Sequence, residues 1–314
     1  MNPVRIPYIG NSAYCYSNST SMLLASMGEN ISPSLVEVLS GVGVGAFILS
    51  PGNLPFFSGI TGEPDRGVTQ ALKILGFEFN EKAVEKGPAP FDELKSLLEN
   101  SPAVLGPLDM GYLTYDPDYN HHRGIDHYVL VYKLDNKGAH LHDPAGFPYV
   151  VIPLEDLEKA WRADAIGYKR GSYRYWTYPK RISNPSSEEI YKQALDYFKL
   201  LYKEAQEAEK TENKKVNKGA ILFLAGRAKN NELSEGEKEH LINFALPLGA
   251  KRAIDYAIFF ENHNVELSDL KNMQSILFGE TYSFAVGGEW HATADTLAKL
   301  ADVEEEFRIK IASN

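Results

Sequence analysis

The sequence has 314 residues, of which 44% are hydrophobic and 24% charged, and its formal net charge is −10. This composition is typical of a globular chain that can bury a core, and the excess of acidic residues argues against nucleic acid as a partner. No apolar run approaches the roughly 20 residues that span a bilayer, the N-terminus lacks the pattern of a secretory leader, and a single cysteine excludes an intramolecular disulfide, so we expect a cytoplasmic protein.

The first part of the sequence is predicted to be mainly helical. Cys15 stands at the head of an apolar run, and glycine, serine and proline residues mark the ends of the helices. We expect helices over residues 15–27, 32–41, 67–75 and 91–98. The glycine-rich segment 41–59, GVGVGAFILSPGNLPFFSG, lacks the Lys-Ser/Thr pair of a phosphate-binding loop. It is instead predicted to form a tightly packed turn beside the Cys15 helix.

The periodicity changes after residue 100. Runs of β-branched and aromatic residues, separated by turn residues, predict strands over 102–109, 127–134, 139–143, 148–153 and 172–178. The sequence DNKG between the second and third of these strands predicts a hairpin, and residues 154–161 predict a short amphipathic helix. Helices followed by mostly antiparallel strands indicate an α+β domain.

A polar stretch with two prolines, residues 178–189, marks a domain boundary. Beyond it, apolar residues recur at helical spacing, and Ser234 is predicted to cap one of the helices. Helices are expected from residue 187 onward and over 217–229, 235–247, 249–262, 266–278 and 290–310. We therefore predict an α+β domain over residues 1–180 and an all-α domain over residues 181–314.

Cys15 is the first candidate for chemistry. A cysteine nucleophile needs an environment that favours the thiolate, a base that takes up its proton, and a donor for the oxyanion that forms. The N-terminus of a helix supplies part of this environment through its free N–H groups and its dipole. Because a lone cysteine is most often a passive buried residue, Cys15 predicts catalysis only together with partners elsewhere in the chain.

His127 and Asp143 are the candidate partners. His127 opens a strongly apolar strand, and Asp143 ends the strand predicted to pair with it. An aspartate beside an imidazole fixes its tautomer and stabilises the imidazolium. Since side chains alternate along a strand, the two share a face only if paired positions sum to an even number, as when 127 or 129 pairs with 143. A two-residue hairpin loop would place them on opposite faces unless a bulge intervenes, and the sequence leaves this register open.

The remaining histidines do not form a metal-binding pattern, and the sequence contains no HExxH motif, so neither a metal nor another cofactor is expected. Aromatic and polar residues near the three candidates are instead expected to contact substrate. These residues are Tyr14, Tyr112, Tyr115 and His122.

The same residues carry a resemblance to known cysteine enzymes. A cysteine that heads a helix, followed far downstream by DHYVLV and HDPAGF, has the order seen in papain-like cysteine peptidases, including those that remove double-glycine leaders. More specifically, the chain resembles the N-terminal domain of the butirosin biosynthesis protein H family, and its second half resembles the helical domain that often follows. The stretches that carry this resemblance are 15–47, 102–115, 124–135 and 142–147.

The resemblance implies a papain-like fold in which Cys15 is the nucleophile, His127 the base and Asp143 the residue that orients the base. One position departs from the papain-like pattern. That pattern has a glutamine six residues before the cysteine, which donates to the oxyanion, and this chain has Ile9 there. In this chain, Asn11 or backbone N–H groups would have to donate the hydrogen bond to the oxyanion instead. Loss of such a donor typically costs about 10²–10³ in rate, which weighs more against peptide hydrolysis than against transfer from an activated thioester.

The family's named member transfers an acyl group from a carrier-protein thioester to an aminoglycoside amine. The resemblance therefore implies cysteine-dependent acyl transfer to an amine, through an acyl-enzyme on Cys15, in secondary-metabolite biosynthesis. The expected donor is a small acyl thioester, an amide or an acyl carrier protein; neither nucleic acid nor a membrane is expected as a partner. The alternatives are a papain-like peptidase or amidase, and a non-catalytic binding module whose helical domain forms a homodimer or covers the cleft.

Overall fold

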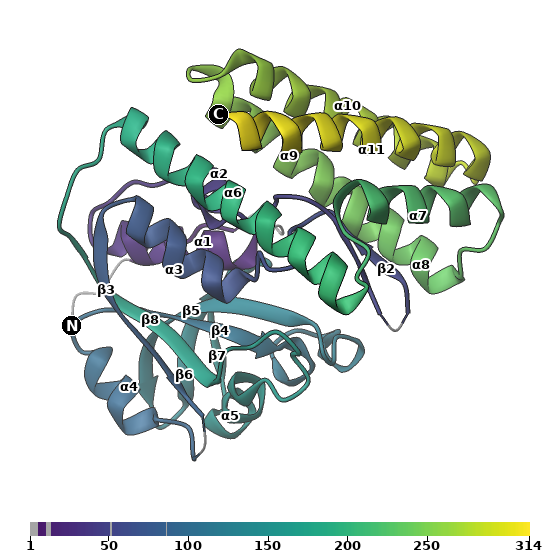
Figure 1. The fold of residues 1–314 in the computed structure, drawn as a ribbon. Coiled ribbons are helices and arrows are strands. Elements are labelled where there is room, and N and C mark those ends of the chain that lie inside the picture. The colour runs from purple at the N-terminus through teal and green to yellow at the C-terminus, as the bar shows by residue number, and fades with distance from the viewer. Residues whose placement is uncertain (1–5, 11–13, 51, 86) are drawn as a thin grey trace. The chain divides into compact units, whose positions relative to one another are not determined.

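The computed structural model describes residues 6–10, 14–50, 52–85 and 87–314, and Figure 1 labels its helices and strands. The chain divides into two compact units. The first comprises Met1–Val36 and Pro64–Asn184, and the second comprises Glu37–Glu63 and Pro185–Asn314. The division after Asn184 lies close to the predicted boundary. The segment 37–63 differs from expectation, because it belongs to the helical unit rather than to the first.

The first unit is built on a six-stranded antiparallel sheet with the order β3-β8-β4-β5-β6-β7. The strands are β3 (Phe77–Val84), β4 (Ala103–Asp109), β5 (Asp126–Asp135), β6 (Gly138–Asp143), β7 (Phe147–Ile152) and β8 (Ser172–Arg181). Every residue of β4 is buried, and β5 is buried over most of its length, as expected for central strands covered on both faces.

Helices cover both faces of this sheet (Figure 1). They are α1 (Cys15–Ser26), α3 (Pro64–Ile74), α4 (Phe91–Leu97) and α5 (Leu154–Arg162). One face packs against α4 and α5 in a core that includes Leu94, Val129 and Trp161. The other face contacts α1, in which residues 16–24 are all buried. Two buried hydroxyls of α1 find partners, because Ser19 donates to the Tyr128 carbonyl of β5 and Thr20 donates to the Tyr16 carbonyl within the helix.

The second unit is predominantly helical. Its helices are α6 (Ser187–Glu212), α7 (Asn217–Lys229), α8 (Glu235–His240), α9 (Leu246–Glu261), α10 (Val265–Val286) and α11 (Trp290–Ser313). A π-helical turn, Leu241–Ala245, joins α8 to α9. Ser234 caps α8 as predicted, because its hydroxyl accepts a hydrogen bond from the N–H of Glu237 and the Glu237 carboxylate accepts one from the N–H of Ser234. The division between the units falls within α2 (Pro33–Ser40).

The glycine-rich segment forms part of the core of the helical unit, whereas the prediction assigned it to the unit that contains the Cys15 helix. It contains the two-stranded hairpin β1 (Phe47–Leu49) and β2 (Leu54–Phe56). Its apolar residues Ala46, Ile48 and Phe57 are buried together with residues of α7, α9 and α10. A Cβ atom at Gly43 would lie 2.9 Å from the ring of Tyr256 in α9, so the absence of a side chain there allows the close approach.

Together these elements confirm the prediction of an α+β domain followed by a helical region. A helix headed by Cys15 packs against a central antiparallel sheet, and the second half of the chain is helical. In the part of the chain that the structure describes, no helix is long and apolar enough to cross a membrane.

The hairpin between β5 and β6 turns at Gly138, whose φ of 133° favours glycine. A Cβ atom there would lie 2.1 Å from the carbonyl oxygen of Ile152. We expect Gly138→Ala to destabilise the protein by more than about 1 kcal/mol. Alanine disfavours this positive φ, and its Cβ atom would clash with the carbonyl oxygen of Ile152. Gly167→Ala, where nothing lies within 4 Å of the added atom, is the control in the same unit. Denaturant unfolding followed by circular dichroism measures both, and equal stability of the two variants would show that the hairpin geometry is not constrained as described.

Candidate active site

Cys15 is the first residue of α1 and is half-buried. The residue before it, Tyr14, has a left-handed backbone conformation with φ of 59° and ψ of 51°, so the chain turns sharply into the helix. The Tyr14 side chain makes no capping hydrogen bond. Its carbonyl oxygen accepts from the backbone and side-chain N–H groups of Asn18, which closes the first turn. Cys15 therefore stands at a helix N-terminus, where the dipole favours a negative charge.

The register of the β5–β6 hairpin decides whether His127 and Asp143 meet. Next to the two-residue loop, paired positions sum to an odd number, which would send the two side chains to opposite faces. A bulge at Tyr132 shifts the register by one residue, so that Val131 pairs with Leu141 and the sums become even. The sequence did not decide whether this hairpin contains a bulge. The structure has one, and it places the side chains of His127 and Asp143 on the same face of the sheet.

His127 and Asp143 form a buried hydrogen-bonded pair. The Nε2 atom of His127 lies 2.7 Å from Oδ1 of Asp143, and the two residues are only 5% and 2% exposed. The Cys15 side chain lies near enough to the imidazole to be one of the groups that raise the pKa of His127. Because Nε2 is engaged by Asp143, the nitrogen available to the thiol is Nδ1. The structure thus brings His127 and Asp143 into direct contact, and Cys15 lies near enough to affect the pKa of the imidazole.

The electrostatics of this pair favour an imidazolium and a carboxylate. Burial by itself would lower the pKa of His127, but the charge and hydrogen bond of Asp143, together with Cys15, raise that pKa well above its ordinary value. Burial also favours the neutral form of Asp143. The charge and hydrogen bond of His127, with the N–H of Ala145 and the hydroxyl of Tyr115, nevertheless hold the pKa of the carboxyl below its usual value.

Further groups hold Asp143 in place. The N–H of Ala145 donates to Oδ1 at 2.7 Å, and the hydroxyl of Tyr115 donates to Oδ2 at 2.7 Å. The hydroxyl of Tyr8 donates to the Asp143 carbonyl oxygen at 3.0 Å and accepts from the N–H of Gly146 at 3.0 Å. Tyr115 was expected to contact substrate; in the structure its hydroxyl contacts Asp143.

The loop between β4 and β5, residues 110–125, carries Tyr115 and is closed at its base by Asp109. Oδ1 of this buried carboxylate accepts hydrogen bonds from the N–H groups of Gly111 and Gly124, both at 2.9 Å. One side chain therefore fixes both ends of the loop. The sequence analysis missed Asp109, although an aspartate at a strand end before a glycine is a common turn signal.

Two other residues expected to bind substrate lie on the same loop and face other partners. The guanidinium of Arg123 lies 4.7 Å from the ring centroid of Tyr112 and donates to its hydroxyl. The Nδ1 atom of His122 lies 3.5 Å from Oδ2 of Asp116. The structure therefore does not bring Tyr112 or His122 into contact with the His127–Asp143 pair.

The remaining predicted residues lie before the helix. Tyr14 is buried, with 4% of its surface exposed. Ile9, which replaces the glutamine of the papain-like pattern, is half-buried. Asn11, the candidate oxyanion donor, lies outside the described residues.

His142, next to Asp143, is a buried histidine with a structural role. Its Nδ1 accepts a hydrogen bond from the N–H of Tyr149 at 3.1 Å, and its Nε2 donates to the carbonyl oxygen of Ile6 at 3.2 Å. Burial lowers its pKa, which favours the neutral tautomer that these two bonds require. His142 therefore holds residues 6–10, the segment that leads to Cys15, against β6.

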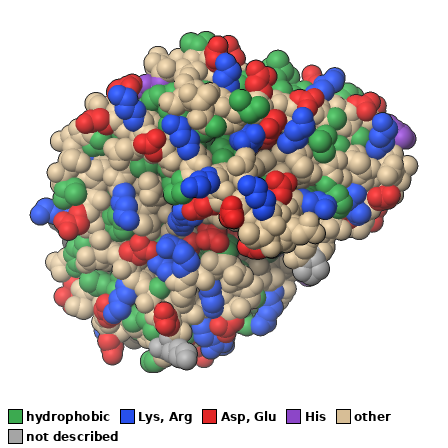
Figure 2. All heavy atoms as spheres, viewed as in Figure 1, with side chains coloured by type: hydrophobic (Ala, Val, Ile, Leu, Met, Phe, Trp, Pro, Cys, Tyr) green, Lys and Arg blue, Asp and Glu red, His purple; other side chains and the backbone are tan. Residues whose placement is uncertain are grey.

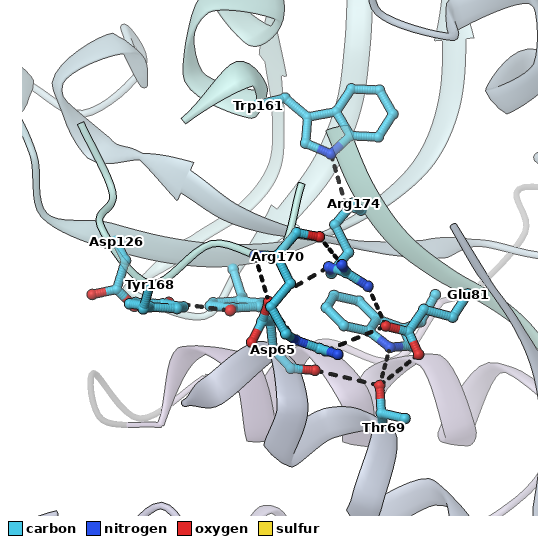
Figure 3. Close-up of polar contacts among 10 residues, drawn as sticks. Asp65, Thr69, Glu81, Asp126, Trp161, Tyr168, Arg170 and Arg174 are labelled. Carbon is cyan, nitrogen blue, oxygen red and sulfur yellow. Dashed lines mark hydrogen bonds and ion pairs between the residues drawn. The ribbon is translucent and has the colours of Figure 1, made fainter. Parts of the chain in front are cut away.

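A second polar network braces the start of β5 (Figure 3). The hydroxyl of Tyr168 donates to Oδ2 of Asp126 at 2.8 Å and lies 3.2 Å from the hydroxyl of Tyr128. Tyr168 lies in the loop between α5 and β8, residues 163–171. In this loop, Nε of Arg170 donates to the fully buried carboxylate of Asp65 in α3 at 3.1 Å. This loop therefore connects α3 to the strand end that carries His127.

No group of three or more His, Cys, Asp or Glu side chains is arranged to hold a metal ion within the described ranges. The face of the molecule shown in Figure 2 carries interspersed acidic and basic side chains.

Comparisons with known proteins identify two regions of this chain that match described families. Residues 14–144 match the family described as butirosin biosynthesis protein H, N-terminal, and this range contains Cys15, His127 and Asp143. Residues 210–312 match the YobF C-terminal domain. A crystal structure of a C39-like peptidase from Bacillus anthracis is 16% identical, with a TM-score of 0.39, and the match covers 57% of this chain and 96% of that one. That likeness is too distant to support an argument about function.

The Cys15 helix and the strands β3 to β6 of the sheet therefore lie in a region similar to the butirosin biosynthesis protein H N-terminal family. YobF of Bacillus subtilis (strain 168) is 43% identical over 305 residues, which cover 97% of both chains. The chain belongs to the YobF family.

The buried pair predicts how His127 titrates. Its imidazole should have a pKa above 6.5, and Asp143→Asn should lower that pKa because burial then acts without the opposing carboxylate. Since the folded-state pKa of His127 is raised, its stabilising contribution is fully present below pH 6.5 and is lost as the pH rises through the folded value. Histidine NMR resonances followed against pH measure this. A His127 pKa at or below 6.5 in the wild-type protein would contradict the pairing.

Proposed function

We propose that this protein is a cysteine-dependent acyltransferase that moves an acyl group from a thioester to an amine. The observation that carries the proposal is the buried His127–Asp143 hydrogen bond of 2.7 Å, with Cys15 near enough to raise the pKa of the imidazole. A nucleophile, a base and a group that orients the base are the parts that covalent acyl transfer requires.

The proposed reaction has two halves. In the neutral form of His127, Nδ1 accepts the proton of the Cys15 thiol, and the sulfur attacks the carbonyl carbon of the donor. The thiol of the donor leaves with the proton from Nδ1, and an acyl-enzyme remains on Cys15. An amine then attacks the acyl carbon, its proton passes to Nδ1 and on to the Cys15 sulfur, and an amide is released. Asp143 stabilises the imidazolium that forms in each half.

Two observations support transfer over peptide hydrolysis. The half-buried side chain at the glutamine position of the papain-like pattern is Ile9, which cannot donate a hydrogen bond to an oxyanion. A thioester is more activated than an amide and depends less on that donor. The butirosin biosynthesis protein H match also favours transfer, because the resemblance implies an acyltransferase.

The net charge of −10 favours a small acyl thioester over an acidic carrier protein as the donor, since like charges disfavour encounter. The carrier-protein donor therefore requires a local basic surface on this chain.

Trapping of the acyl-enzyme tests the first half-reaction. On incubation with small acyl thioesters, the intact mass should increase by one acyl group. The adduct must lie on the only thiol in the chain, Cys15. Cys15→Ala should show no adduct, and His127→Ala should slow acylation by about 10²–10⁴-fold. His140→Ala removes a histidine from the same hairpin and should react like wild type. If no thioester, amide or carrier-linked donor acylates Cys15, the catalytic proposal fails, and the better interpretation is that the protein is a non-catalytic binding module.

Competition between amine and water tests the second half-reaction. As the concentration of a primary amine increases, the amide should replace the free acid among the products. The rate of thiol release should stay constant where formation of the acyl-enzyme is rate-limiting, as ping-pong chemistry requires. Chromatography with mass detection measures both products. Free acid as the sole product at every amine concentration would identify a hydrolase instead.

A further inference from the structure

The carboxylate of Asp143 is held by three donors within the described part of the chain. Oδ1 accepts from Nε2 of His127 and from the N–H of Ala145, and Oδ2 accepts from the hydroxyl of Tyr115. The first two donors converge on one oxygen. Among the described residues, Tyr115 alone engages Oδ2, so its hydroxyl opposes rotation of the carboxylate plane.

We propose that Tyr115 is a positioning residue, whose hydroxyl fixes the Asp143 carboxylate so that Oδ1 stays directed at His127. This inference rests on the proposed function of Cys15, His127 and Asp143, and it assigns Tyr115 an indirect role with no contact to substrate.

Tyr115 is itself held at fixed points. Its ring packs against the ring of Phe147 at the start of β7, with centroids 5.6 Å apart and an angle of 63° between the planes. The neighbouring Thr114 donates to Oδ2 of Asp156 in α5 at 3.1 Å, and Asp109 closes the base of the loop. Because the loop is anchored at its base, near its middle and through the ring, the hydroxyl has little freedom to leave Asp143.

The Tyr115 hydroxyl remains a donor throughout the working pH range. Burial, followed by the charge and hydrogen bond of Asp143 and the charge of Asp116, raises the pKa of Tyr115 well above its ordinary value. The titratable groups around the carboxylate come from four elements: His127 from β5, Tyr115 and Asp116 from the loop, Tyr8 from the N-terminal segment and Cys15 from α1. The hydrogen bond from Tyr115 is one of the interactions that lower the pKa of Asp143.

Tyr115→Phe keeps the ring and removes the donor. We expect kcat for acyl transfer to decrease about tenfold with KM within about twofold, because the lost contact orients the reacting groups and does not bind substrate. The pH at which activity is lost on acidification should move upward, because Asp143 loses an interaction that favours its charged form. Tyr119→Phe is the matched control. Tyr119 lies four residues later in the same loop, in the 3₁₀ turn Tyr119–His121, so this variant should behave like wild type.

Alkylation of Cys15 by iodoacetamide supplies a readout that requires no substrate. Tyr115→Phe should slow it about tenfold at pH 7, and the same substitution in an Asp143→Asn background should change it less than twofold, because Tyr115 acts through Asp143. Circular dichroism verifies that each variant is folded. An unchanged rate in Tyr115→Phe, or an equal loss in both backgrounds, would overturn the positioning role. Failure of every acyl donor, with alkylation still dependent on Tyr115, would reject the acyltransferase proposal and leave this inference standing.

Discussion

The first unit depends on one buried ionic contact, the hydrogen bond between His127 and Asp143. Two ionisable groups that are almost fully buried are costly unless each is paired and hydrogen-bonded. The structure meets this requirement from several directions, because the β6–β7 turn, the loop that carries Tyr115 and the N-terminal segment that carries Tyr8 all hydrogen-bond Asp143. Segments far apart in sequence are thereby placed around the same carboxylate, next to the helix that begins with Cys15.

The contact is available only because β5 contains one extra residue. A two-residue loop and a regular hairpin would leave His127 and Asp143 on opposite faces of the sheet. The bulge at Tyr132 corrects the register between the loop and the site, so the tight turn and the shared face coexist. Bulges are frequent beside active sites for this reason: they redirect a side chain without changing the strand order. The position of one unpaired residue thus decides whether the base has its partner.

Much of this arrangement could be predicted from the sequence. The helix at Cys15, the strands with His127 and Asp143 and the helical second half follow from local patterns of apolar and turn residues. The bulge could not be located, because Tyr132 fits a regular strand as well as a bulged one. The partner of Tyr115 could not be identified either, since an aromatic residue in a polar loop does not reveal whether it faces substrate or protein. Both depend on contacts between residues distant in sequence.

The glycine-rich segment shows why the two family matches do not correspond to two separable domains. The first match, residues 14–144, includes the segment 37–63, which belongs to the helical unit. There, Nε of Arg252 donates to the fully buried carboxylate of Glu37 at 2.8 Å, and Ile48 and Phe57 are buried in the helical core. A chain ending near residue 180 would leave the Glu37 carboxylate without its guanidinium partner and expose these apolar side chains. Removing one partner of a buried pair costs about 3–5 kcal/mol, a large share of the stability of a typical domain. The helical region is therefore required for the folding of residues 37–63, although these residues lie inside the butirosin biosynthesis protein H match.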